Sequence, residues 1–154
     1  MALIPEWLVD YVNSAFPKNV CLVGVTLADG YAQISPRGSV LVYDENTLAI
    51  WDRGKGGTHD SVQDGTKMTV YYRNQELGRR GGGNGLLPAG GIARFYGAAE
   101  LHPEDGEIRE KVWNDMAEQE RNNDPDKAGM AVLIKLERAE QLNHKPLSEL
   151  PGPE

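Results

Sequence analysis

Residues 35–40, Ser-Pro-Arg-Gly-Ser-Val, combine three residue types that suit an anion site. Pro36 stiffens the backbone, and Gly38 lets another group approach the main chain closely. Arg37 carries a planar fork of N–H donors whose geometry matches phosphate oxygens. The segment therefore predicts an anion contact through Arg37. The same pattern is equally compatible with a solvated arginine at the start of a strand.

A second segment, residues 51–58, places two cations and a hydroxyl in a glycine-rich stretch. Arg53 and Lys55 are separated by a single glycine, and Thr58 follows as a candidate N-cap of a short helix. Unpaired N–H groups and the dipole at a helix N-terminus favour phosphate. The segment lacks the Gly-x-x-x-x-Gly-Lys-Ser/Thr pattern of a Walker loop. The alternative interpretation is a mobile hairpin loop that binds nothing.

The predicted strand order brings these two segments together. Apolar patterning predicts strands at residues 39–43 and 48–52, joined by a turn at residues 44–46. In such a hairpin, Arg37 and the loop after Asp52 lie at the same end. The chain is acidic, with a formal net charge of −7, so a convergence of cations there indicates a single anion site. The converging cations are Arg37, Arg53 and Lys55.

The remaining pattern predicts a mostly β fold with few helices. Further strands are predicted at residues 20–26, 31–35, 67–73, 92–101 and 129–136, the last extended by 138–142. Helices are predicted at residues 5–14, 58–63 and 103–121, the last with an apolar face of Ile108, Val112, Trp113 and Met116. Hairpin-length connections such as Asp29-Gly30 favour antiparallel pairing, and closure into a barrel protects the sheet edges. We therefore expect a mainly antiparallel barrel with flanking helices.

The chain length suits one domain, predicted at residues 1–142. Residues 143–154 hold three prolines and no periodicity, so a C-terminal tail is predicted there. Residues 78–91 contain seven glycines and one proline and are predicted to form a long, flexible loop. This loop does not carry the Gly-x-Gly-x-x-Gly fingerprint of dinucleotide-binding folds.

In order and spacing, several segments resemble the pyridoxamine 5'-phosphate oxidase-like, FMN-binding split-barrel family. The segments are residues 22–30, 34–38, 48–52 and 92–99. The resemblance covers residues 5–140 and implies a six- or seven-stranded split barrel that binds flavin mononucleotide (FMN) and forms a homodimer with the cofactor at the interface. It implies that Arg37 binds the FMN phosphate and that residues 53–58 close over it. The residues predicted to bind the cofactor are Arg37, Gly38, Ser39, Val40, Ile50, Trp51, Lys55 and Thr58.

The chain departs from the vitamin B6 oxidases at the positions where those enzymes hold their substrate. Val42 stands in place of a lysine that contacts the substrate phosphate, and Ile92 in place of a glutamine that reaches the partner's flavin. The C-terminal arginine and histidine motif is absent, because Arg138 and His144 have the wrong spacing. The resemblance therefore implies an FMN-dependent oxidoreductase with another substrate, not the vitamin B6 oxidase itself.

Two alternatives within the same fold class stay open at this point. One is a cofactor-binding module without catalysis, carrying flavin or haem, for which His59 is the only histidine near the predicted site. The other is a reductase that uses the deazaflavin F420. The catalytic residues are not predicted. The three histidines have no metal-ligand spacing, so no metal site is expected.

Composition excludes several other classes of protein. The acidic charge argues against binding to nucleic acid or to an anionic membrane surface. The single cysteine, Cys21, lies in an apolar run and is expected to be a small buried residue with no disulfide partner. The sequence contains no secretory signal pattern and no long apolar span, so a soluble, cytoplasmic protein is expected.

Overall fold

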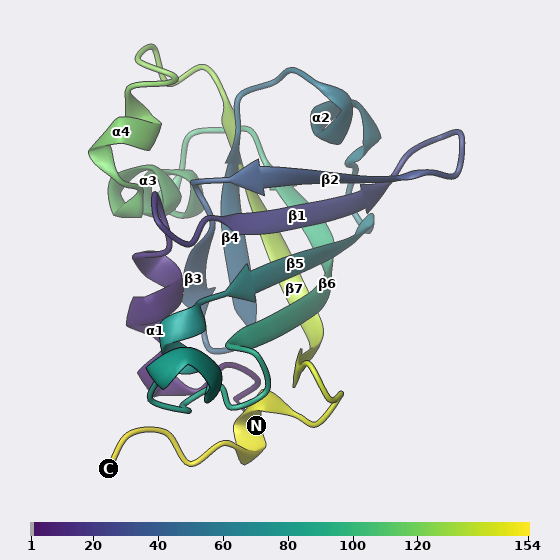
Figure 1. Cartoon of the computed structure of the whole chain (residues 1–154). Helices are drawn as coiled ribbons and strands as arrows, with labels where there is room; N and C mark the ends of the chain where they lie inside the picture. Colours follow the sequence, from purple (N-terminus) through teal and green to yellow (C-terminus); the bar gives the residue numbers. More distant parts are fainter. Residues whose placement is uncertain (1) are drawn as a thin grey trace.

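The computed structural model describes residues 2–154, which fold around one seven-stranded, antiparallel sheet. The strands are β1 (Cys21–Thr26), β2 (Ala32–Arg37), β3 (Leu41–Asp44), β4 (Thr47–Asp52), β5 (Lys67–Arg73), β6 (Ile92–His102) and β7 (Met130–Gln141). Their order in the sheet is β2-β1-β5-β6-β7-β4-β3. The predicted mostly β, antiparallel split barrel with flanking helices is confirmed, with seven strands (Figure 1).

The two outermost strands of this sheet are neighbours in sequence. β2 ends at Arg37 and β3 begins at Leu41, so residues 38–40 alone connect one end of the sheet to the other. The sheet must therefore curl until its two ends meet at this short connection. This is the segment in which the sequence predicts an anion contact.

Four α-helices flank the barrel within residues 2–154: α1 (Glu6–Asn13), α2 (Gly57–Ser61), α3 (Glu107–Asp115) and α4 (Glu118–Arg121). α1 begins after Pro5, within the helix predicted at residues 5–14, and buries Leu8 and Val12 against the core. Figure 1 shows α3 and α4 together beside the end of β2, with α2 above that strand, toward its beginning.

The prediction of one helix over residues 103–121 is wrong. The chain is extended at Met116 and Ala117, with ψ angles of 152° and 145°, and this separates α3 from α4. The break turns the Met116 side chain inward, where it is 3% exposed. The predicted apolar face is nonetheless used, because Val112 and Met116 are buried and Ile108 and Trp113 pack against them.

The main core lies inside the barrel, and a second, smaller cluster lies under α3. The main core contains Tyr72 and Phe95, both fully buried. Cys21 is also buried there, and desolvation raises the pKa of its thiol to about 12, which leaves the thiol unreactive. The second cluster holds Trp51 and Trp113, whose ring centroids are 5.0 Å apart.

Two segments predicted as irregular are well packed. In residues 143–154, Leu147 on the 3₁₀ turn η3 (Leu147–Glu149) is fully buried in the main core. In residues 78–91, Leu87 is 1% exposed and belongs to the same core. The long glycine-rich segment is thus anchored to the barrel. No helix within residues 2–154 is both long and apolar enough to cross a membrane, and the cytoplasmic location stays a prediction.

Candidate functional site

Arg37 and the loop after β4 meet in one small pocket, as the hairpin argument predicts. The pocket has a volume of about 110 Å³. We call it the Arg37 pocket; it is lined by Pro36, Arg37, Gly38, Ser39, Trp51, Arg53, Glu120 and Asn123. Two cations and a hydroxyl therefore face one hollow at the place where the two ends of the sheet meet.

Arg37 is half-buried at the edge of this pocket. Desolvation lowers the pKa of its guanidinium, and the nearby positive charge of Arg53 acts in the same direction, whereas the charges of Asp52 and Glu120 oppose the shift. The guanidinium remains charged at neutral pH, because arginine is effectively always protonated. Two cations held close together with partial desolvation form a favourable environment for an anion.

Ser39 is buried and joins the pocket to the adjacent strand. Its hydroxyl oxygen accepts a hydrogen bond of 3.1 Å from the backbone N–H of Trp51. The hydroxyl proton therefore stays available for donation to an acceptor in the pocket. Gly38 lies beside Ser39, and a Cβ there would collide with the carboxylate of Glu120.

Other predicted residues lie outside the Arg37 pocket. Val40 and Ile50 are 4% and 1% exposed, and their side chains belong to the main core. Lys55 is exposed, and Thr58 is buried within α2. Neither lines the pocket.

The prediction of Thr58 as an N-cap is wrong, because α2 begins one residue earlier, at Gly57. Gly56 occupies the N-cap position with a φ of 98°, a left-handed conformation that favours glycine. The glycine-rich stretch therefore turns the chain into α2 sooner than the side-chain pattern indicates.

Gln33 marks a second polar position between β2 and α2. Its side-chain oxygen is buried, and no residue of the described chain donates a hydrogen bond to it. A Cβ at Gly57 would collide with this amide, so the absence of a side chain at Gly57 makes room for Gln33. An unpaired buried acceptor costs about 1–3 kcal/mol, which a ligand hydroxyl beside it would offset. Gln33 and Arg37 have the same side-chain direction on β2, because they are four residues apart in one strand.

Asp52 and His59 form a pair directly after β4. The Asp52 carboxylate is buried and lies 2.7 Å from the Nδ1 of His59, and it also accepts a 2.9 Å hydrogen bond from the backbone N–H of Gly54. The imidazole is thereby fixed in orientation, with one third of its side chain exposed. Asp52 thus shapes the loop as well as contributing negative charge near Arg37.

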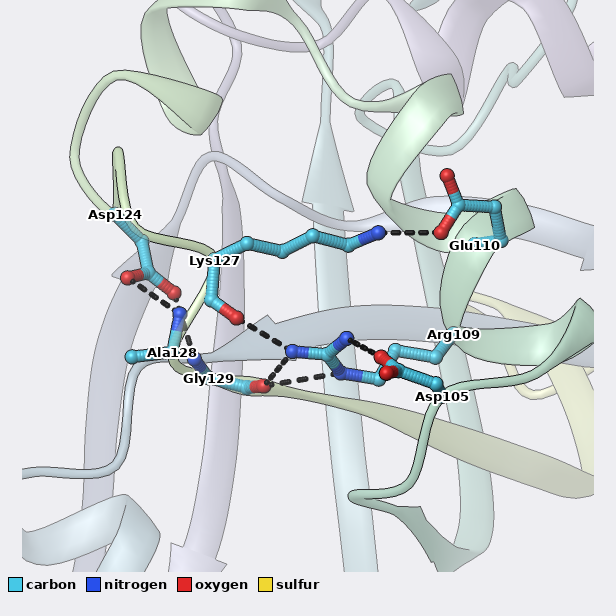
Figure 2. Close-up of polar contacts among 7 residues, drawn as sticks. All are labelled: Asp105, Arg109, Glu110, Asp124, Lys127, Ala128 and Gly129. Atoms are coloured by element: carbon cyan, nitrogen blue, oxygen red, sulfur yellow. Dashed lines mark hydrogen bonds and ion pairs between the residues drawn. The ribbon is translucent and has the colours of Figure 1, made fainter.

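A buried arginine holds the segment after α3 against the barrel (Figure 2). Arg109 donates to the carbonyl oxygens of Lys127 and Gly129, and pairs with Asp105 at 2.7 Å. Its guanidinium carbon also lies 5.2 Å from the ring centroid of Trp51. Arg109 therefore satisfies backbone carbonyls and covers the indole that forms one wall of the Arg37 pocket.

Asp124 completes this arrangement from the other side of the same segment (Figure 2). Its carboxylate accepts hydrogen bonds from the Trp51 indole at 2.8 Å, from the Gly129 N–H at 2.8 Å and from the Ala128 N–H at 3.0 Å. Burial acts to raise the pKa of Asp124, but these hydrogen bonds outweigh it, so the pKa lies below its ordinary value. The carboxylate is thus ionised and fixed at neutral pH.

The sequence interpretation did not identify Gln33, Glu120, Asn123 or Asp124 as neighbours of the site. Gln33 had a detectable signal, because it precedes Arg37 on the same strand face by an even number of residues. The other three belong to a segment more than 80 residues after Arg37 in the sequence. Local residue spacing does not predict that such a distant segment packs beside Arg37. Within residues 2–154 there is no group of three or more histidine, cysteine or acidic side chains that could hold a metal ion.

No family model matches the sequence, and no curated protein matches it, but solved structures do. HupZ of Group A Streptococcus superposes with a TM-score of 0.64 at 20% identity, over 93% of this chain and 97% of its own. A candidate pyridoxamine 5'-phosphate oxidase of Lactobacillus delbrueckii has a TM-score of 0.58 at 21% identity, covering 84% and 90%. An FMN-binding protein of Syntrophomonas wolfei has a TM-score of 0.57 at 12% identity, covering 86% and 84%.

The chain has the pyridoxamine 5'-phosphate oxidase-like split-barrel fold. The predicted resemblance is confirmed at the level of the fold, because identities this low carry the fold alone. An F420 reductase shares the fold as well, with a TM-score of 0.56 at 11% identity over 89% of this chain and 98% of its own. Solved structures with this fold are thus named for different cofactors, FMN in one case and F420 in another.

Proposed function

We propose that this protein is an FMN-binding flavoprotein of the pyridoxamine 5'-phosphate oxidase-like class and an oxidoreductase. The observation that carries the proposal is the Arg37 pocket, in which Arg37, Arg53 and Ser39 face one hollow in an otherwise acidic chain. An FMN-binding protein among the structures with this fold supports the same cofactor. When bound, the flavin supplies the electron or hydride chemistry, and the protein supplies orientation and charge.

In this proposal, Arg37 binds the FMN phosphate through charge-assisted hydrogen bonds, and Arg53 adds positive charge. Ser39 donates its free hydroxyl proton to the phosphate or to the ribityl chain. The unpaired oxygen of Gln33 accepts from a ribityl hydroxyl, since it is the buried acceptor that lacks a donor. Lys55 and Thr58 lie on the loop and helix that follow β4, where closure of the loop over the cofactor would bring Lys55 nearer.

The first experiment is an absorption spectrum of the purified protein, with mass analysis of the cofactor that heat releases. We expect a yellow protein that releases FMN. If the cofactor is lost during purification, titration of FMN into the protein replaces the spectrum. Release of F420, or an absence of FMN binding in the titration, would contradict the proposal.

The assignment of Arg37 has its own test. We expect Arg37→Ala to weaken FMN binding by about 1.5–3 kcal/mol, the range for a hydrogen bond to a charged group. Arg138→Ala is the matched control, because Arg138 is exposed, lies on β7 and does not line the pocket. Unchanged FMN affinity in Arg37→Ala, measured by flavin fluorescence quenching, would remove Arg37 from the site.

Haem carriage is the second candidate function, and one pair of residues favours it. The His59 imidazole is oriented by the buried Asp52 carboxylate, an arrangement that also orients histidines that bind metal ions. In that case the absorption spectrum would show a Soret band, and His59→Ala would abolish it. A flavin spectrum in both the wild type and His59→Ala would exclude this candidate.

We also propose that the protein is a homodimer. The outer face of β1, β2, β5 and β6 carries a hollow of about 500 Å³ lined mainly by apolar side chains, among them Leu22, Ile34 and Tyr71. Ile34 is 66% exposed, and Tyr31 at the nearby turn is 74% exposed. Exposed apolar patches of this kind mark interaction surfaces. Sedimentation velocity is expected to give the mass of a dimer, and Ile34→Lys to give a monomer; a monomeric wild type would contradict the proposal.

A further inference from the structure

The glycine-rich segment 78–91 is folded by close backbone contacts. A Cβ at Gly83 would collide with the carbonyl oxygen of Gly78, and one at Gly91 would collide with that of Asn74. The N–H groups of Gly85 and Leu87 bond to the carbonyl oxygens of Gly78 and Leu77. These contacts require glycine, so the shape of the segment is specified by its sequence.

This folded segment borders a hollow with a volume of about 760 Å³. We call it the glycine-loop hollow. Binding sites for small molecules span roughly 300–1,000 Å³, so the hollow has the size of such a site. Its wall is partly apolar, because Pro88 and Leu142 line it.

Three arginines line the glycine-loop hollow: Arg73, Arg79 and Arg80. No ion pair joins any of them to an acidic residue of residues 2–154. The single carboxylate of the lining, Glu76, is paired with Lys18 at 2.7 Å. The hollow therefore presents about three uncompensated positive charges on a chain whose formal net charge is −7.

We propose that the glycine-loop hollow binds a small organic phosphate, a phosphomonoester with an apolar part. Arginine forks match phosphate oxygens in geometry and charge. The apolar wall at Pro88 and Leu142 takes the uncharged part of the molecule. The size of the hollow and the formal net charge of −7 argue against a nucleic acid as the ligand. The site is separate from the Arg37 pocket, since the two share no lining residue.

Titration calorimetry of AMP into the full-length protein at low ionic strength tests this proposal. The protein used in every titration carries Arg37→Gln, so that AMP cannot bind through Arg37 in the other pocket. Adenosine, which lacks the phosphate, is the uncharged control ligand. We expect AMP to bind, adenosine to bind at least tenfold more weakly, and the added pair Arg79→Gln and Arg80→Gln to weaken AMP at least tenfold. Both arginines are exposed, so these substitutions leave the fold intact, which circular dichroism checks.

Arg138→Gln is the matched control, because it removes an exposed arginine outside the hollow. It should change the AMP affinity by less than twofold. Absence of AMP binding, or equal binding by the Arg79 and Arg80 variant, would overturn the proposal. FMN titration of Arg79→Gln and Arg80→Gln together, with Arg37 kept as in the wild type, separates the two proposals: unchanged FMN affinity leaves the flavin proposal standing whichever way the AMP result falls.

Discussion

The two basic hollows of this protein are built in opposite ways. The Arg37 pocket is small, about 110 Å³, and its Trp51 wall is held by a hydrogen bond to Asp124 and by the guanidinium of Arg109 over the indole ring. The glycine-loop hollow is large, about 760 Å³, and its wall is held by backbone packing at Gly78, Gly83 and Gly91. A shaped, charged surface can thus be built either from buried polar side chains or from glycines that let the main chain pack against itself.

The two hollows differ as well in the acid that each contains. Glu76 in the glycine-loop hollow is already paired with Lys18. Glu120 in the Arg37 pocket has no ion pair within residues 2–154, and its carboxylate lies against Gly38. An anion entering the Arg37 pocket therefore meets a carboxylate without an ion-pair partner among residues 2–154, whereas the carboxylate in the other hollow is paired with a lysine.

Removal of the Asp124 carboxylate should have the largest effect and should damage only the side-chain-built wall. Asp124→Ala leaves the Trp51 indole and two backbone N–H groups without their acceptor. Two of these three donors, the Trp51 indole and the Gly129 N–H, are buried. At about 1–3 kcal/mol for each unsatisfied buried group, we expect about 2–6 kcal/mol of lost stability in urea unfolding, together with weaker FMN binding. Asp115→Ala is the control, because Asp115 makes an exposed pair with Lys111 and should cost less than about 1 kcal/mol.

The contribution of Asp124 to stability should depend on pH. The pKa of Asp124 is lower in the folded state, so its stabilisation is complete above the unfolded pKa of about 3.9 and is lost as the pH falls through the folded pKa. The stability difference between the wild type and Asp124→Asn should therefore shrink as the pH falls from 5 toward the folded pKa. A difference that stays constant over that range would show that the charge of Asp124 does not stabilise the fold.

A change at Gly83 should damage the backbone-built wall instead. Gly83→Ala places a Cβ against the carbonyl oxygen of Gly78, and overpacking of this kind costs about 1–3 kcal/mol. Gly24→Ala is the control, because a Cβ at Gly24 meets its nearest neighbour at an ordinary 3.8 Å. We expect Gly83→Ala to lower the thermal midpoint while FMN affinity stays unchanged. An equal loss of FMN binding would mean that the two hollows are not independent.

The smallest effect is expected at Glu120. Glu120→Gln removes the negative charge beside Arg37 and Gly38, and a like charge at about 4 Å costs about 1 kcal/mol even in water. FMN should therefore bind about fivefold more tightly to this variant. Glu118→Gln, an exposed residue of the same helix α4, is the control and should leave the affinity unchanged. Weaker FMN binding in Glu120→Gln would indicate that the carboxylate contacts the cofactor directly.

Much of the fold was predictable because local patterns determine it. The strand over residues 67–73 was predicted with the bounds that β5 has, since its β-branched and aromatic residues stand between polar turns. The helix over residues 103–121 was wrong, because the burial of Met116 is a tertiary effect that periodicity does not encode. The meeting of Arg37 and Arg53 was predictable from hairpin geometry. The contribution of Glu120 was not, because it depends on how a distant segment folds back over β4.

The three-residue connection between β2 and β3 has a consequence for breathing motions of the barrel. Edge strands usually open first, and here both edges converge on residues 38–40. A molecule bound to Arg37 and Ser39 would therefore hold the two edge strands together at the place where the barrel can open. Its binding energy would then slow amide hydrogen exchange in β2 and β3 together, although those strands occupy opposite ends of the sheet.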